Sequence, residues 1–372
     1  MRILLVGGGS GGHAFPLIAV SRKLKQISNA RGYGQSEFLF IGPDQYSRSI
    51  FKNEGIPARA IFAGKIRRYF SPANFLDILI MPLGIIQAYW YIFWFMPDVI
   101  FAKGGYGSAP SVFIGWLFRI PIIIHESDIV PGLANKILSI FSKKIIVSFN
   151  DTTRFFPVRK TTVAGNPIRE NLFSMVPENP REVIKIKSEK PVIFIIGGSQ
   201  GAKQINDLVI LALPEFLKRY EIIHQCGEQN YEDLRKEAFL EIKNKEDRAL
   251  YHLYAALDEI EMASAYNISD VIVSRAGSGA IFEIAASGKP SVLIPYSSSA
   301  GDHQVRNAEI YAGSGASIAL GDENLMPHMV LSEVDSIIDN PEKAKSMSEA
   351  ALRFAKPDAA QKIAEEIFKV LT

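Results

Sequence analysis

Short apolar runs alternate with helix-like patterns along most of the chain. Residues 2–6 form an apolar run that ends at a glycine-rich turn, residues 7–12, after which apolar residues recur with the spacing of one helix face. Strand, glycine turn and helix return in the same order at residues 192–209 and 271–285. A strand that passes through such a turn into a helix is the repeating unit of parallel α/β sheets. The pattern therefore predicts an α/β protein.

A break rich in proline and glycine divides this alternation into two halves. Further strands are expected at residues 38–41, 98–102, 121–124, 145–148, 161–164 and 291–295. Gly165 to Arg169 interrupts the pattern and is typical of a domain boundary. A chain of 372 residues is also too long for one ordinary core. We expect two Rossmann-like domains whose parallel sheets face a cleft: residues 1–166, with a C-terminal helix (355–372) packed on them, and residues 167–354.

The segment 271–307 gives the strongest indication of a ligand. A helix that starts at a glycine turn directs N–H groups and the positive end of its dipole at the turn, which suits a phosphate or diphosphate. Glu283 lies about one turn into this helix, where its carboxylate could accept hydrogen bonds from a ribose diol. The next strand leads to a polar segment at its carboxyl end, where ligands bind in such sheets, containing Asp302, His303, Gln304 and Asn307. A surface βα unit without a ligand is the alternative, and the ordered set of features favours binding.

The two earlier glycine turns do not match two common nucleotide sites. Gly7 to Gly12 fits G-x-G-x-x-G, but no acid follows at the end of the next strand to hold a ribose, because Asp44 comes late and in a turn. A nicotinamide cofactor is therefore disfavoured. Residues 197–202 are not a Walker A loop, since Lys203 does not directly follow the glycine. Each turn could still bind a phosphate.

Residues 75–96 form the most apolar segment and are nearly long enough to cross a bilayer. Asp77 argues against a true span, because a charge in hydrocarbon is costly. A wholly buried helix and a helix with an aromatic surface at the membrane interface both remain open. Basic residues just upstream could meet anionic headgroups or be solvated loop charges: Lys65, Arg67 and Arg68. The side chains expected at a membrane are Trp90, Phe93 and Trp94.

Composition narrows the class of partner. The formal net charge is +2, whereas nucleic-acid binders usually show a strong basic excess, so no nucleic-acid partner is expected. The single cysteine, Cys226, excludes an internal disulfide and fits a reducing cytoplasm. The N-terminus enters a strand without the hydrophobic region of a signal peptide, so export is not expected. No D-x-D pair or zinc-like histidine spacing occurs, and helix starts together with Arg169 could offset a diphosphate charge, so neither a metal nor a cofactor is expected.

Six motifs, spread over nearly the whole chain, occur in a specific order: GGGSGGHAFP, GGYGSAP, HESDIVPGLANK, AGNPIR, GGSQGA and SRAGSGAIFEIAASGKP…DHQVRNA. In this order they resemble the peptidoglycan N-acetylglucosaminyltransferases of glycosyltransferase family 28. The resemblance implies a GT-B fold and inverting, metal-independent transfer of N-acetylglucosamine from UDP-N-acetylglucosamine to the muramyl 4-hydroxyl of lipid I, forming lipid II. It also implies peripheral attachment to the cytoplasmic face of the cell membrane, which favours the interfacial interpretation of residues 75–96.

The family's binding residues carry over onto matching positions of this sequence. Glu283 would hold the ribose, and Gln304 would hold the sugar hydroxyls. The implied donor contacts are Ser10, Gly11, Gly12, Asp128, Arg169, Ser199, Leu257, Ser278, Gly279, Ala280, Ile281, Phe282, Glu283 and Gln304. The implied acceptor contacts, on the first glycine loop and the following strand ends, are Gly9, Ser10, Gly11, His13, Gly104, Gly105, Tyr106, His125 and Glu126.

The group that accepts the proton remains open among three side chains. His13 matches the histidine proposed to act near the acceptor, and an ordinary histidine pKa suits a general base, although His13 could equally hydrogen-bond a phosphate. Asp128 stands where the family usually has an amide, so it accepts hydrogen bonds where an amide could donate one. We therefore interpret His13 and Asp128 as the catalytic pair, with Asp128 as base or as partner of His13, and Glu126 as the third candidate. A lone histidine such as His125 is more often structural than catalytic.

Two other functions use the same features. A UDP-N-acetylglucosamine epimerase on this fold would need no lipid acceptor, and its soluble substrate gives no reason to expose the aromatic segment at 75–96. A non-catalytic nucleotide-binding scaffold of cell-wall assembly would keep the glycine turns without the chemistry.

Overall fold

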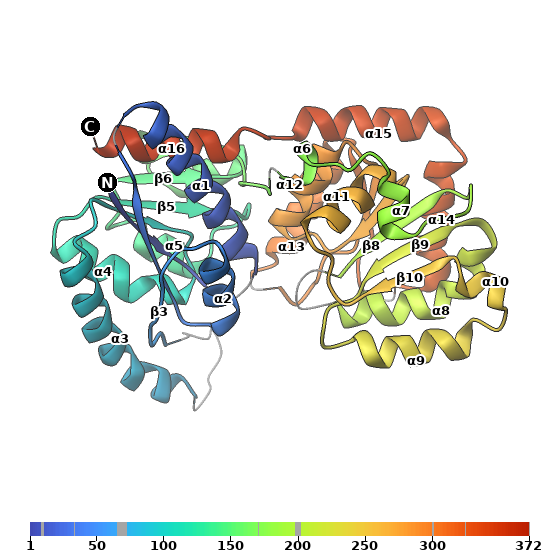
Figure 1. Cartoon of the computed structure of the whole chain (residues 1–372), viewed down its shortest axis with the longest axis horizontal. Helices are drawn as coiled ribbons and strands as arrows, with labels where there is room; N and C mark the ends of the chain where they lie inside the picture. The colour runs from blue at the N-terminus through green and yellow to red at the C-terminus, as the bar shows by residue number, and fades with distance from the viewer. Residues whose placement is uncertain are drawn as a thin grey trace. The chain divides into compact units, whose positions relative to one another are not determined.

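The computed structural model describes residues 1–8, 11–32, 34–64, 73–169, 171–197, 202–299, 301–323 and 325–371. Two compact units make up the chain: Met1–Ile168 together with Lys356–Thr372, and Arg169–Ala355. Each unit is an α/β domain built on one parallel sheet (Figure 1). The predicted class of two Rossmann-like domains is therefore confirmed.

The first unit contains a seven-stranded parallel sheet. Its strands are β1 (Arg2–Val6), β2 (Glu37–Gly42), β3 (Ala58–Ala60), β4 (Val99–Ala102), β5 (Ile122–Glu126), β6 (Lys144–Val147) and β7 (Thr161–Val163). They lie in the order β3-β2-β1-β4-β5-β6-β7. The strand order reverses between β1 and β4, and ligands bind outside the carboxyl ends of strands at such a switch point.

Helices cover both faces of this sheet. They are α1 (Gly11–Ala30), α2 (Gln45–Asn53), α3 (Ala73–Phe95), α4 (Ala109–Leu117), α5 (Leu133–Leu138) and, from the C-terminus, α16 (Ala359–Leu371). Successive side chains of a strand point to opposite faces. Ile3 and Leu5 accordingly share a core cluster with α1 and α16, whereas Leu4 and Val6 share another with α3 and α4. The ion pair between Lys144 and Glu366, 2.8 Å, adds a polar contact between β6 and α16.

The second unit contains a six-stranded parallel sheet in the order β10-β9-β8-β11-β12-β13. Its strands are β8 (Val192–Ile196), β9 (Glu221–Gln225), β10 (Tyr251–Tyr254), β11 (Val271–Ser274), β12 (Ser291–Leu293) and β13 (Ser317–Ala319). Its helices are α6 (Asn171–Ser174), α7 (Pro180–Ile184), α8 (Lys203–Arg219), α9 (Tyr231–Glu241), α10 (Lys245–Arg248), α11 (Glu259–Ile268), α12 (Ser278–Ser287), α13 (His303–Gly313), α14 (Pro327–Ile338) and α15 (Pro341–Phe354). This is the strand order of a dinucleotide-binding fold, and its switch point lies between β8 and β11.

The predicted strands are present in the structure, which also contains β3, β9, β10 and β13, four strands that were not predicted. One predicted strand differs in an informative way. β1 and β8 span the predicted residues 2–6 and 192–196. The strand expected to end at Ile124 continues as β5 through His125 and Glu126, and both of these side chains are buried. Polar side chains extend this strand because hydrogen bonds inside the protein satisfy them, as described below.

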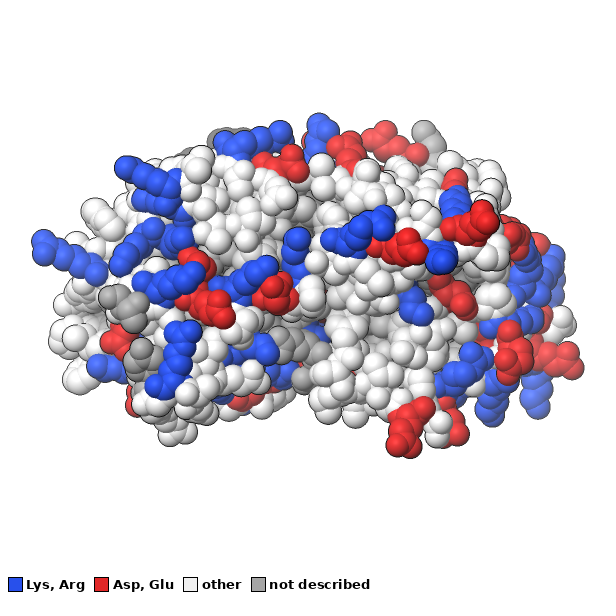
Figure 2. Space-filling model, turned by 90° about the horizontal axis from the view of Figure 1, so that it is seen from above, with Lys and Arg blue, Asp and Glu red and all other residues white. Residues whose placement is uncertain are grey.

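Charged side chains of both signs are spread over the surface. Figure 2 shows Lys and Arg interspersed with Asp and Glu on the face that it displays. This distribution agrees with the formal net charge of +2.

Candidate active site

His13, near the start of α1, lies close to the carboxyl ends of β1 and β4. A Cβ atom placed on Gly7 would lie 3.3 Å from Cβ of Lys103 and 3.9 Å from Cβ of His13. A Cβ on Gly105 would lie 3.5 Å from Nε2 of His13. The two backbone segments thus pack closely around His13. Of the predicted loop residues, Gly11 and Gly12 begin α1, whereas Gly9 and Ser10 lie outside the described residues.

The environment of His13 keeps its imidazole neutral. The side chain is half-buried in the first turn of α1. Burial and then the charge of Lys103 lower its pKa to about 4, although Asp128 and Asp44 act in the opposite direction. At neutral pH the ring therefore retains a lone pair that can accept a proton, as a general base requires.

Lys103 is a buried residue of this region that the sequence analysis did not select. It follows β4 and is only 2% exposed. Its Nζ lies 2.6 Å from Nδ1 of His125 and 2.9 Å from Oδ1 of Asn166. Burial lowers the pKa of Lys103 to about 7, while the charges of Glu126 and Asp128 raise it. A lysine placed directly before a glycine turn at a strand end was the available signal for this position.

His125 forms hydrogen bonds with several groups of the first unit. Its Nε2 lies 3.1 Å from the carbonyl oxygen of Gly165. Because a carbonyl can only accept, Nε2 carries the proton and Nδ1 accepts from Lys103. Burial and Lys103 hold the pKa of His125 well below its ordinary value. His125 therefore has the bonding of a satisfied structural histidine.

Glu126 organises the loop that carries Asp128. Its carboxylate accepts hydrogen bonds from the backbone N–H of Asp128 (3.0 Å), the backbone N–H of Gly132 (3.1 Å) and Nδ2 of Asn135 (2.9 Å). Burial and the charge of Asp128 raise the pKa of Glu126 to about 7, although the three donors oppose this shift. With its oxygens already accepting three hydrogen bonds, Glu126 is placed to position Asp128.

The second glycine segment of the first unit needs its glycines for packing. Gly104 has a φ of +89°, and a Cβ there would lie within 2.6 Å of the side-chain amide of Asn135. Tyr106 follows in a 3₁₀ turn, Tyr106–Ser108, and is half-buried. The predicted acceptor positions in the described part of this unit thus cluster at the neighbouring carboxyl ends of β1, β4 and β5.

In the second unit, Glu283 is fixed by a bidentate ion pair. Nε and Nη2 of Arg169 each donate to one carboxylate oxygen of Glu283 at 2.9 Å. The hydroxyl of Tyr266 donates to Oε2 of Glu283 at 3.3 Å. The side chains of Arg169 and Glu283 are 15% and 13% exposed. Arg169, expected to offset the charge of a diphosphate, directs its guanidinium to Glu283 in the structure.

The start of α12 contains the other predicted donor positions of this region. Gly277 precedes the helix, and Ser278, Gly279 and Ala280 form its first turn. The side chains of Ile281 and Phe282 are buried in the core, so a ligand could contact these two positions only through the backbone. The resulting arrangement is a helix start followed by a fixed carboxylate, which suits a phosphate and a ribose.

The remaining predicted positions of this unit follow other strands of the sheet. Gln304, on the first turn of α13, accepts a hydrogen bond from the backbone N–H of Tyr296 at 3.0 Å. Leu257 is buried after β10. Ser199 lies outside the described residues.

Arg275 lies at the same edge of the sheet and was not predicted. Its guanidinium donates to the carbonyl of Ile294 (3.0 Å) and to Oε1 of Gln204 (2.8 Å), and it lies 3.5 Å from the carboxylate of Asp322. These contacts tie the end of β11 to the ends of β12 and β13 and to α8. Its position immediately after β11, inside the glycine turn, was the signal that sequence reasoning overlooked.

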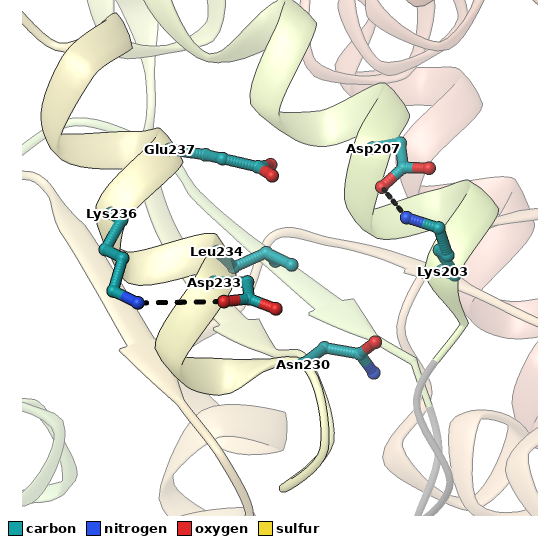
Figure 3. A pocket seen from close by; sticks show the side chains of 7 residues that line it. All are labelled: Lys203, Asp207, Asn230, Asp233, Leu234, Lys236 and Glu237. Atoms are coloured by element: carbon teal, nitrogen blue, oxygen red, sulfur yellow. Dashed lines mark ion pairs between the residues drawn. The ribbon is translucent and has the colours of Figure 1, made fainter.

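Other polar features of the second unit lie away from these residues. A surface pocket of about 230 Å³ lies between α8 and α9. The side chains that line it, drawn in Figure 3, carry charges of both signs and include the ion pairs Lys203–Asp207 (3.5 Å) and Lys236–Asp233 (3.8 Å). None of the predicted site residues lines it. Within the described ranges, no group of three or more His, Cys, Asp or Glu residues is arranged to hold a metal ion.

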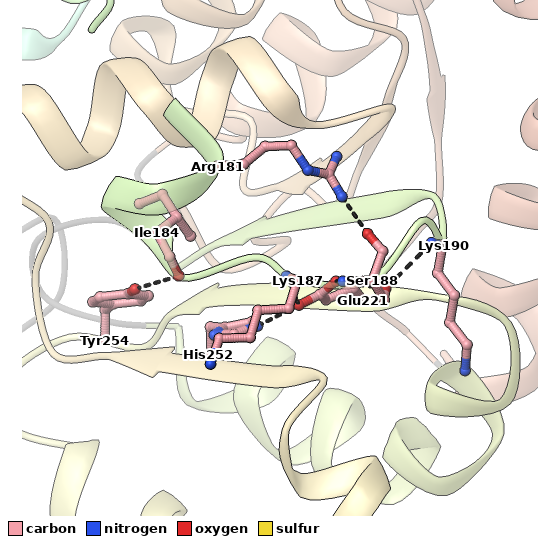
Figure 4. Close-up of polar contacts among 8 residues, drawn as sticks. All are labelled: Arg181, Ile184, Lys187, Ser188, Lys190, Glu221, His252 and Tyr254. Carbon is pink, nitrogen blue, oxygen red and sulfur yellow. Dashed lines mark hydrogen bonds and ion pairs between the residues drawn. The ribbon is translucent and has the colours of Figure 1, made fainter. Parts of the chain in front are cut away.

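A buried polar cluster marks the opposite, amino end of the second sheet. Glu221, the first residue of β9, accepts hydrogen bonds from the backbone N–H and hydroxyl of Ser188 and lies 2.7 Å from Nε2 of His252 (Figure 4). Although burial acts to raise its pKa, these donors lower the pKa of Glu221 overall. The cluster fastens the segment before β8 to the sheet, and its place at the amino end separates it from the ligand-binding edge.

The apolar segment of the first unit is helix α3, and its aromatic face is exposed. Trp90, Phe93 and Trp94 are 58%, 47% and 66% exposed. Ala88 and Ile92 on the same helix are buried against the sheet. No helix within the described part of the chain combines the length and apolarity needed to cross a membrane. The interpretation of this segment as a wholly buried helix was therefore wrong.

Two doubly wound units with phosphate-competent helix starts define an enzyme of the GT-B nucleotide-sugar class. Residues 3–147 match the glycosyltransferase family 28 N-terminal domain, and residues 192–363 match its C-terminal domain. The chain belongs to the MurG N-acetylglucosamine transferases of glycosyltransferase family 28.

Individual relatives agree with this assignment. The chain is 38% identical over 349 residues to a UDP-N-acetylglucosamine–N-acetylmuramyl-(pentapeptide) pyrophosphoryl-undecaprenol N-acetylglucosamine transferase of Bacillus cereus, covering 93% of this chain and 94% of that protein. It is 39% identical over 339 residues to the transferase of the same name from Clostridium kluyveri, covering 90% and 91%.

Solved structures show the same fold. The crystal structure of Acinetobacter baumannii MurG superimposes with a TM-score of 0.73 at 25% identity, covering 99% of each chain. A UDP-GlcNAc 2-epimerase from Neisseria meningitidis shares only the fold, with a TM-score of 0.68 at 15% identity, covering 99% of this chain and 100% of the epimerase.

Proposed function

We propose that this enzyme transfers N-acetylglucosamine from UDP-N-acetylglucosamine to the muramyl 4-hydroxyl of lipid I, with inversion and without a metal, to form lipid II. The observation that carries the proposal is the bidentate Arg169–Glu283 pair behind the start of α12. It presents a carboxylate of fixed orientation for the two ribose hydroxyls. The family membership supplies the reaction class.

The second unit, Arg169–Ala355, binds the donor in this proposal. The first turn of α12 receives the diphosphate, because its N–H groups and dipole favour negative charge by about 0.3–1 kcal/mol when exposed and up to about 2 kcal/mol when partly buried. Gln304, half-buried on α13, contacts the hydroxyls of the transferred sugar. Several such donors together stabilise the departing UDP in the role that a metal ion fills elsewhere.

The first unit binds the acceptor, and His13 is its general base. The muramyl 4-hydroxyl oxygen attacks C1 of N-acetylglucosamine from the face opposite UDP, and a new C–O bond forms as the bond from C1 to the β-phosphate oxygen breaks. The hydroxyl proton passes to His13, and the electron pair of the broken bond leaves with UDP. Because burial lowers the pKa of His13 to about 4, its imidazole is unprotonated at pH 7, before the acceptor's proton is transferred.

The exposed aromatic face of α3 is the proposed contact with the cytoplasmic face of the membrane. Trp90 and Trp94 stack edge to face with ring centroids 5.7 Å apart. Trp116, on the adjoining helix α4, is also 49% exposed. Tryptophan is favoured at the membrane–water interface, where its ring is partly apolar and its N–H remains hydrated. Lys65, Arg67 and Arg68, the predicted headgroup contacts, lie outside the described residues.

A transfer assay tests the reaction. The protein is incubated with radiolabelled UDP-N-acetylglucosamine and a short-chain lipid I analogue, with and without EDTA. We expect label in the lipid product in both samples. UDP release or epimerisation without the lipid would instead support the epimerase, and tight UDP binding without transfer would support a non-catalytic scaffold. Loss of transfer in EDTA, restored by added Mg²⁺, would overturn metal independence.

A further inference from the structure

Lys103 is a buried cation packed beside the candidate base. Both side chains lie next to Gly7. A Cβ atom added to Gly7 would be 3.3 Å from Cβ of Lys103 and 3.9 Å from Cβ of His13. Two acceptors hold its ammonium in place, Nδ1 of His125 and Oδ1 of Asn166. This side chain therefore cannot turn out to solvent without breaking both hydrogen bonds.

We propose that Lys103 is a positioning residue that sets the charge of His13 in the resting enzyme: its buried ammonium disfavours an imidazolium, so that His13 is neutral when the acceptor binds. This inference rests on the proposed function, because it takes His13 as the base. A buried charge acts strongly on a neighbour, since little water screens it.

The charges around His13 come from three sides. Lys103 follows β4, Asp128 lies in the loop after β5, and Asp44 caps α2. The two carboxylates favour an imidazolium, whereas Lys103 and burial oppose it. Because the pKa of Lys103 lies near 7, its ammonium forms over the pH range in which an ordinary histidine would take up a proton. The charge of Lys103 is therefore present in the pH range in which His13 would otherwise become protonated.

His125 and Asn166 determine where this charge sits. The Nε2–H of His125 is committed to the carbonyl of Gly165 at 3.1 Å, so Nδ1 presents its lone pair to Lys103. The side-chain oxygen of Asn166 provides the second acceptor for this ammonium, at 2.9 Å. These two hydrogen bonds hold the ammonium beyond the end of β4, and its charge lowers the pKa of His13.

The test is a titration of the His13 side chain by NMR, which needs no substrate. The protein has six histidines, and the spectrum of His13→Gln identifies the His13 resonance. In the wild type we expect His13 to remain neutral down to about pH 5. In Lys103→Gln, which keeps an amide donor for His125 but loses the charge, we expect its midpoint to rise by about one to two pH units.

Two further variants separate charge from packing. Lys103→Arg retains the charge and should leave the His13 titration as in the wild type. Lys52→Met removes an exposed lysine from α2 and is the matched control, with no expected change. If His13 in folded Lys103→Gln titrates at the wild-type pH, the inference is wrong.

The pH dependence of kcat/KM for transfer supplies the catalytic readout. In Lys103→Gln the acidic limb should move to higher pH together with the His13 midpoint. A shifted midpoint with an unshifted limb would overturn Lys103 as a positioning residue for catalysis. Absence of transfer by the wild type would overturn the proposed function, and the NMR titration would still decide the effect of Lys103 on His13.

Discussion

Replacing Glu283 with Gln tests the donor site, because it removes one negative charge while keeping the size of the side chain. Arg169 would keep one acceptor and lose the other, and a ribose would lose a charged acceptor. The variant therefore acts on two measurable quantities, the free energy of unfolding and the affinity for UDP. The structure predicts a separate magnitude for each.

Stability should fall because the pair is largely buried, with side chains 15% and 13% exposed. Removing one partner of a buried pair costs about 3–5 kcal/mol. Gln preserves one of the two 2.9 Å hydrogen bonds. We therefore expect the free energy of unfolding to fall by about 2–3 kcal/mol. Binding should weaken because a hydrogen bond to a charged group contributes about 1.5–3 kcal/mol. Loss of this charge from the ribose contact predicts a Kd for UDP that is about 10- to 100-fold higher.

Urea unfolding and calorimetric titration with UDP measure the two effects on the same preparations. Glu309→Gln is the matched control, since Glu309 forms an exposed ion pair with Arg306 on α13. We expect it to lower the free energy of unfolding by less than about 1 kcal/mol and to leave the Kd for UDP unchanged. A folded Glu283→Gln protein that is less stable but binds UDP with the wild-type Kd would refute the ribose contact and leave Glu283 with a structural role only.

Three further predictions address the membrane, acid stability and loop packing. Trp94→Ser should weaken binding to anionic liposomes about tenfold or more in a sedimentation assay. Leu240→Ser, at a residue of the second unit that is 74% exposed, should leave this binding unchanged. Equal effects of the two substitutions would contradict α3 as the membrane contact. Burial lowers the pKa of His224 to about 3, below its unfolded value of about 6.5. Between these two values the unfolded chain binds a proton at His224 and the folded protein does not, so the stability present above pH 6.5 is lost as pH falls toward 3, by up to about 1.4 kcal/mol per pH unit. Urea unfolding from pH 7 to 5 should therefore show a shallower pH slope for His224→Gln, and an unchanged slope would count against this. Gly104→Ala should lower the free energy of unfolding by about 1–3 kcal/mol, since the φ of Gly104 is +89° and a Cβ there would collide with a buried amide. Gly132→Ala, at a glycine with open space around it, should lower it by less than about 1 kcal/mol. Similar melting temperatures for the two variants would show that the loop relaxes freely.

Local patterns were sufficient to predict most strands of the first sheet, half of those of the second, and the place of Glu283, whereas β3, β9, β10 and β13 were not predicted. Apolar runs such as Val192 to Ile196 match strands because a central parallel strand is buried on both faces. Glu283 lies on α12 because the glycine turn and the apolar spacing behind it fix both the start and the inward face of that helix. These features depend on residues close together in sequence.

The partners of the site residues could not be predicted in the same way. Arg169 and Glu283 are 114 positions apart, and Lys103 and Asn166 are 63 apart. Only the folded sheet brings such residues together, and a buried lysine departs from the usual exposure of its residue type. The burial of His125 likewise follows from its partners and not from its neighbours in sequence.

A crystal structure of the enzyme with UDP would test the central claim most directly through one distance, that between the carboxylate oxygens of Glu283 and the ribose hydroxyls. We predict about 2.5–3.0 Å for both hydroxyls, with the diphosphate at the first turn of α12. A ribose bound elsewhere, with Glu283 contacting only Arg169 and Tyr266, would contradict the account.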